Sequence, residues 1–161
     1  RTWRDLVPTP SRFAGGLRFL GTTTAVVVYG QITLGAWLRH QGQTSALAVH
    51  GTLALGVVVL VLTFSKVLGD AAAEGVECGA NRAPLRFLQR LQVGSLIAQF
   101  VLGVLATIAI YFISGGMESE VSVGEVAFAT AHVFVGAVLL SSVVVGAMYS
   151  RRALTGEEVG A

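Results

Sequence analysis

The sequence has few charged residues and almost no cysteine, and both shortages narrow the kinds of protein it can be. Only 12% of its 161 residues are charged and 53% are hydrophobic, whereas a water-soluble domain carries about 25% charged residues. A soluble domain of this length has too little interior to hide several uninterrupted apolar segments, which argues against a water-soluble fold. The single cysteine, Cys78, has no partner for a disulfide or a metal motif and is expected to be an ordinary thiol. A formal net charge of only +2 gives no reason to expect a nucleic-acid partner.

Four apolar stretches are long enough to cross a membrane. They cover about residues 17–38, 47–65, 91–113 and 126–149, each near the ~20 residues that the hydrocarbon layer requires. The sequence therefore predicts an all-α integral membrane protein, a single domain of four transmembrane helices in contact with membrane lipid. The chain starts with Arg1 instead of methionine, and no signal-peptide pattern precedes the first stretch. We therefore expect it to be an excerpt of a longer protein.

The basic residues gather at one end of the predicted helices. They flank both termini and the connection between the second and third spans: Arg1, Arg4, Arg12, Arg18, Lys66, Arg82, Arg86, Arg90, Arg151 and Arg152. Only Arg39 lies at the other end, where the connection before the fourth span carries glutamates. By the positive-inside rule, this pattern predicts a multi-pass protein of the cell (inner) membrane with both termini in the cytoplasm.

A short pattern recurs in the first and third spans. Gln31–Gly35 and Gln99–Gly103 both read Q-x-x-L-G, and the span after each copy carries a histidine, His50 or His132. The pattern predicts two similar helical hairpins related by a pseudo-twofold axis along the membrane normal, with the histidines facing each other across it. Chance recurrence is the alternative, because small and amide residues serve helix packing in many membrane bundles.

The two histidines indicate a shared ligand, since a histidine inside a span is costly unless it has a partner. Both lie near the outer ends of their spans, at depths that differ by ~5 Å at ~1.5 Å per residue. Heme iron accepts two axial imidazoles. Small residues that leave room for the macrocycle lie one turn before and after each histidine: Ala46, Ala54, Ala129 and Gly136. Zinc fits less well, because only His40 could join the pair. Two unrelated histidines, each hydrogen-bonded on its own, are the other alternative.

Further polar residues lie in or beside the spans. Arg39 and His40, at the outer end of the first span, suit pairing with the carboxylates of heme propionates, although charges that merely flank a span are the alternative. Glu125 is expected at the outer edge of the fourth span, so no buried carboxylate is expected there. The polar residues expected to bond between helices or approach a cofactor are Gln31, Thr33, Gln92 and Gln99.

The run from Gln31 to His40, Q-I-T-L-G-A-W-L-R-H, resembles the end of a first helix in the halves of heme A synthases, where Q-x-x-L-G-A-x-x-R-H recurs. His50, the segment Gln99–Leu105 and His132 follow in the family's order, so the resemblance covers about residues 17–150. Members have eight spans in two similar halves and oxidise a methyl group of heme O to the formyl group of heme A. The resemblance thus implies one half of a membrane oxidoreductase.

The residues before His50 resemble the C-terminal half of that family. The N-terminal half has a glutamate just before this histidine and a cysteine pair in the outer loop, whereas Ala48 and Val49 stand here and residues 41–46 contain no cysteine. The resemblance then gives His50 and His132 the axial positions of a heme b that passes electrons to the catalytic half. It also implies the N-terminal half of the same protein as partner, a quinol or other electron donor, and a possible homo-oligomer.

Two other functions fit the same sequence features. One is a membrane b-type cytochrome, an electron-transfer or anchor subunit without a substrate of its own. The other is a structural or assembly subunit in which the histidines are packed without heme. The first shares the predicted heme site, and the second does not.

Overall fold

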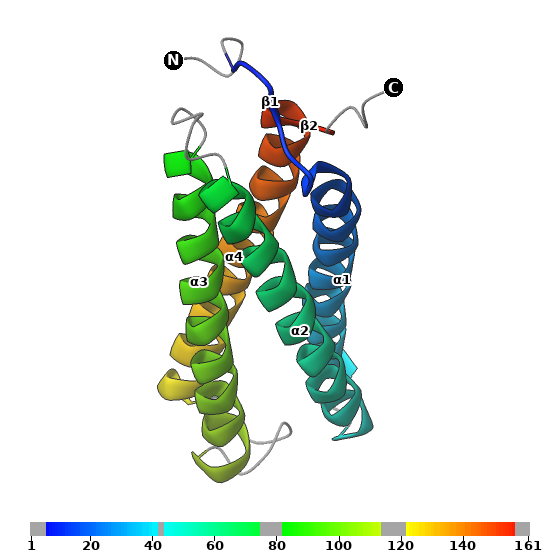
Figure 1. Cartoon of the computed structure of the whole chain (residues 1–161). Coiled ribbons are helices and arrows are strands. Elements are labelled where there is room, and N and C mark those ends of the chain that lie inside the picture. The colour runs from blue at the N-terminus through cyan, green and yellow to red at the C-terminus, as the bar shows by residue number, and fades with distance from the viewer. Residues whose placement is uncertain (1–5, 42–43, 75–81, 114–121, 157–161) are drawn as a thin grey trace.

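The computed structural model describes residues 6–41, 44–74, 82–113 and 122–156. These residues form four helices, α1 (Ala14–Gln41), α2 (Thr44–Glu74), α3 (Arg82–Ile108) and α4 (Val123–Ala153), and α3 continues into a π-helical segment, η3 (Ala109–Ile113). Two short strands, β1 (Thr9–Pro10) and β2 (Leu154–Thr155), pair in parallel. The predicted all-α four-helix bundle is confirmed (Figure 1).

All four helices are long and apolar enough to cross a membrane, as the sequence predicted. They extend beyond the predicted spans, because hydropathy marks only the apolar part of a helix. α2 continues past Ser65 to Glu74, and α3 begins at Arg82 instead of near Leu91. Pro84 lies in the first turn of α3, where its missing N–H has no helical partner to lose.

The helices form a ring in which α1 and α3 each contact both α2 and α4. The strands β1 and β2 and the ends of the helices at Ala14, Glu74, Arg82 and Ala153 lie at one end of the bundle, here named the terminal end. The opposite end, with Gln41, Thr44, Ile113 and Val123, is named the histidine end. The α1–α2 and α3–α4 hairpins come together toward the terminal end and diverge toward the histidine end (Figure 1).

The hydrophobic core is most tightly closed in the terminal half. Phe64 and Leu68 of α2 are fully buried there, and a Cβ on Gly21 of α1 would lie only 2.8 Å from the Cβ of Ala147 in α4. Many large apolar side chains are exposed on the outside of the bundle instead, including Phe19, Val26, Leu55, Val59, Phe87, Ile97, Val133 and Phe134. This is the surface of a multi-pass membrane protein, whose outer side chains contact lipid.

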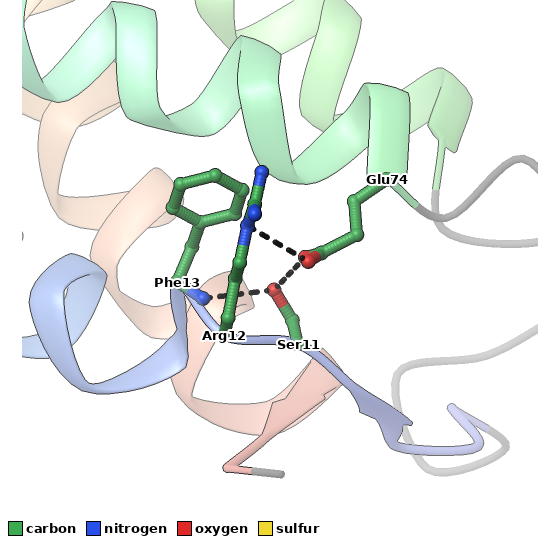
Figure 2. Close-up of polar contacts among 4 residues, drawn as sticks. All are labelled: Ser11, Arg12, Phe13 and Glu74. Atoms are coloured by element: carbon green, nitrogen blue, oxygen red, sulfur yellow. Dashed lines mark hydrogen bonds and ion pairs between the residues drawn. The ribbon is translucent and has the colours of Figure 1, made fainter.

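Polar contacts join the two chain ends to the terminal end of the bundle. The Ser11 hydroxyl donates to Glu74 Oε2 at 2.7 Å, and Arg12 Nε lies 3.2 Å from Glu74 Oε1 (Figure 2). The Arg12 guanidinium lies 4.8 Å from the centre of the Phe13 ring. The Ser11 N–H donates to the Thr155 carbonyl at 2.9 Å, next to the β1–β2 pair. The segment before α1 is therefore tied to both α2 and the residues after α4.

Candidate functional site

His50 of α2 and His132 of α4 occupy matching positions, each against a glycine of the other helix in its hairpin. A Cβ built on Gly35 of α1 would lie 2.9 Å from His50 Cε1, and one on Gly103 of α3 would lie 3.0 Å from His132 Cε1. Each imidazole therefore fills the space that a missing side chain leaves on the facing backbone. Because these glycines end the two Q-x-x-L-G patterns, the same contact recurs in both of the predicted hairpins.

The glutamines that open the two patterns also reach the helix that follows in the chain, as expected. The side-chain N–H of Gln31 donates to the backbone carbonyl of His50 at 2.8 Å. Gln99 reaches the ring of His132 instead, with Gln99 Nε2 3.0 Å from His132 Nε2. The two glutamines thus hold equivalent histidines by different atoms.

The hydrogen bonds of His132 define its tautomer. Its Nδ1 lies 3.1 Å from the backbone carbonyl oxygen of Gln99, and a carbonyl only accepts, so Nδ1 carries the hydrogen and donates. Nε2 then accepts from the Gln99 amide. A donor bond from Nδ1 to a backbone carbonyl is a common way to orient a metal-binding histidine with Nε2 as the ligand atom. His132 is therefore oriented to bind through Nε2.

The ring of His50 has no hydrogen bond to any residue in the described part of the chain, and its Nδ1 is buried. Three other buried side-chain atoms also lack a hydrogen-bond partner among the described residues. The four unpaired atoms among the described residues are Gln31 Oε1, His50 Nδ1, Gln99 Oε1 and the Tyr111 hydroxyl oxygen. All four belong to the half of the bundle toward the histidine end. Buried polar atoms in proteins nearly always have hydrogen-bond partners. A polar group bound in this half of the bundle could therefore serve as a partner for these four atoms.

His50 of α2 and His132 of α4 lie in different hairpins, both in the half of the bundle toward the histidine end. Within residues 6–41, 44–74, 82–113 and 122–156, no group of three or more histidine, cysteine or acidic side chains could hold a metal ion. A pair of imidazoles suits heme iron, which takes two axial ligands from protein, better than it suits zinc.

The remaining predicted site residues lie at the end of α1 and beside His132. Arg39 and His40 lie in the last turn of α1, but their side chains fall outside the described part, so pairing with heme propionates stays a prediction. Cys78 lies outside the described residues as well. The space beside His132 is described, and a Cβ on Gly136 would meet Gln99 Nε2 at 3.2 Å. The room expected at this small residue is therefore taken by Gln99.

Two expectations about polar residues are wrong. Thr33 does not bond between helices, because its hydroxyl donates to the Tyr29 carbonyl of its own helix at 3.0 Å. Glu125 lies at the edge of the fourth span as expected, in the first turn of α4, but it is only 4% exposed, so the expectation that no carboxylate is buried is wrong. The Glu125 N–H donates to the Ser122 hydroxyl at 3.1 Å. The S-x-x-E spacing from Ser122 to Glu125, typical of a helix start, could have revealed this.

Comparison of the chain with protein-family models, with curated proteins and with solved structures finds no match. The resemblance to heme A synthases therefore rests on the motifs themselves, from Gln31 to His132.

Proposed function

We propose that this protein is a heme-binding membrane domain that holds one b-type heme between His50 and His132. The observation that carries the proposal is the doubled contact of a histidine with the glycine of a Q-x-x-L-G pattern, Gly35 with His50 and Gly103 with His132. Two separately packed histidines would not need equivalent places in two hairpins. A shared ligand between the hairpins explains both places at once.

The chemistry of the described residues fits heme. His132 keeps its hydrogen on Nδ1, which leaves Nε2 as the ligand atom. His50 has a buried Nδ1 without a partner and no competing bond to a described residue at its ring. When bound, the heme iron would supply one-electron redox chemistry, and the protein supplies ligation, orientation and an apolar surrounding.

The role that best fits these residues is electron transfer inside a heme A synthase, as its C-terminal, heme b-binding half. Ala48 and Val49 stand where the catalytic half of that family has a glutamate, so this half alone is not the catalytic one. Oxidation of the heme O methyl group would then belong to an N-terminal half. The basic terminal end faces the cytoplasm of a cell with this protein in its inner membrane, and the histidines lie toward the outer face.

The heme site is tested by the reduced-minus-oxidised visible spectrum of the detergent-purified protein and of its His50→Gly and His132→Gly variants. We expect a b-type band in the wild type, its loss in both variants, and partial recovery when free imidazole replaces the missing ligand. Thr33→Ala is the matched control, since Thr33 bonds only within its own helix. A folded wild type that shows no band after reconstitution with heme would contradict the proposal and favour a structural role.

A second experiment separates the synthase from a b-type cytochrome, which would give the same spectrum. Hemes are extracted from cells with the intact gene and from cells in which His132 is replaced by glycine. Loss of heme A together with accumulation of heme O supports the synthase. Unchanged heme A with loss of heme b from the membrane would favour an electron-transfer subunit without its own substrate.

A further inference from the structure

We propose that Gln99 is a removable cover on His132, a positioning residue whose side chain must rotate away before His132 can bind iron. The inference rests on the proposed heme function and concerns how the site is filled. Its backbone carbonyl fixes the ring of His132, while its side-chain amide occupies the atom that a metal needs. Gln99 therefore both orients the His132 ring and blocks the nitrogen through which His132 would bind iron.

The blocking follows from the single lone pair of a neutral imidazole. His132 Nδ1 carries the hydrogen, so Nε2 offers one lone pair, and the Gln99 amide bonds to it at 3.0 Å. The same lone pair cannot accept a hydrogen bond and bind iron at once. The bond between Gln99 Nε2 and His132 Nε2 must therefore break when His132 becomes a ligand.

The position of the Gln99 side chain adds a spatial reason. Gly136 follows His132 by one turn of α4 and is buried, and its missing side chain is what accommodates the Gln99 amide at 3.2 Å from the Cβ position. The amide thus lies beside the imidazole, in the space that small neighbours of the histidine would leave for a flat macrocycle. Rotation of Gln99 frees the lone pair and this space together.

The Gln99 amide is also held by one end only. Its Nε2 bonds to His132, but its Oε1 is buried without a partner among the described residues. Gln92, on the same helix, has both ends bonded, to the Ser65 hydroxyl and the Ser142 carbonyl. Moving Gln99 therefore breaks a single hydrogen bond, whereas moving Gln92 would break two.

Among the described residues, the first hairpin has no equivalent cover. Gln31 donates to the backbone carbonyl of His50, and the His50 ring has no hydrogen bond from a described residue. His50 can therefore bind iron without first losing a hydrogen bond to a described residue, whereas His132 cannot, although their glycine contacts are alike. We infer that His50 binds first and that displacement of Gln99 limits the second ligation.

The experiment adds heme to the heme-free protein and follows the approach to the bis-histidine spectrum in a stopped-flow spectrophotometer. We expect Gln99→Ala to reach this spectrum about fivefold faster than the wild type, the factor that one net hydrogen bond corresponds to, with the final spectrum unchanged. Thr33→Ala, which loses only a bond within its own helix, should leave the rate unchanged. An equal rate in Gln99→Ala and wild type would overturn the proposal, as would equal acceleration by Thr33→Ala.

A second readout needs no heme. The ¹⁵N NMR signal of His132 Nε2 in the heme-free protein should move in Gln99→Leu, which keeps the side-chain bulk but lacks the amide, while the His50 signals stay in place. Gln99→Leu also replaces Gln99→Ala if the alanine variant does not fold. If the signal moves and no variant binds heme, the cover exists and the proposed function fails. If heme binds through both histidines but neither rate nor signal changes, the proposed function stands and the cover is refuted.

Discussion

Gln92 and Gln99 lie about two turns apart on the same helix, α3, and the side chain of each packs against a glycine of α4. Gln92, in the terminal half, is fully buried, accepts from the Ser65 hydroxyl at 2.8 Å and donates to the Ser142 carbonyl at 3.1 Å. Gln99, toward the histidine end, has one bond to a histidine and an unpaired oxygen. A fully bonded amide holds helices together, whereas a half-bonded one beside a histidine is free to exchange partners.

The surroundings of the two glutamines differ in the same way. Phe64, Leu68 and Val143, in the terminal half, are fully buried. His50 and His132 are only partly buried. Among the described residues, the buried side-chain polar atoms that have no hydrogen-bond partner all lie in their half of the bundle. Binding sites are commonly drawn from the less stable parts of a fold. The terminal half therefore keeps the bundle together, and the proposed ligand site lies in the other half.

The largest effect is expected where a side chain is added beside a histidine. Gly103→Val would place a Cβ 3.0 Å from His132 Cε1 and push the ring out of position, and we expect heme affinity to fall by about 10- to 100-fold. Gly94→Val, on the same helix with nothing within 4 Å of its Cβ, is the matched control. Heme titration of both variants provides the measurement, and equal affinities would show that the glycine contact does not hold the histidine.

The next largest effect is expected on stability, when Gln92 and Gln99 are each replaced by leucine. Gln92→Leu leaves the Ser65 hydroxyl and the Ser142 carbonyl without their bonds to this amide and should lower the free energy of unfolding by about 1–3 kcal/mol. Gln99→Leu should lower it by less, since one bond is lost. Thermal unfolding in detergent, followed by circular dichroism, measures both variants. A greater loss for Gln99→Leu would reverse the assignment of the structural and the exchangeable glutamine.

The smallest effect is expected at the terminal end. Ser11→Ala removes the hydroxyl that donates to Glu74 and accepts from the Phe13 N–H, while the ion pair between Arg12 and Glu74 remains. We expect a loss of about 1 kcal/mol or less in stability and no change in heme affinity. A clear fall in heme affinity in this variant would show that the two ends are coupled.

The sequence predicted the fold well because long apolar runs leave a chain few choices. It also showed that a span with a histidine follows each Q-x-x-L-G pattern, but the contact of each histidine with the glycine of the pattern was not predicted. The different bonds of Gln31 and Gln99 could not be predicted, because they depend on side-chain torsions and on the spacing of facing backbones. The helix extension to Glu74 and the burial of Glu125 were missed because hydropathy ignores capping and packing outside the apolar segment.

The parallel pairing of β1 with β2 gives the molecule a nearly circular topology. Thr9 pairs with Leu154 and Pro10 with Thr155, so the first and last described segments run side by side at the terminal end. Because the strands are parallel, a linker that runs back along the pair could join the end of β2 to the start of β1, and new termini could be opened between α2 and α3 at the same end. Such a circular permutant would keep every helix contact of the bundle while starting the chain with the α3–α4 hairpin. The order of the two hairpins along the chain is thus separable from their arrangement in space.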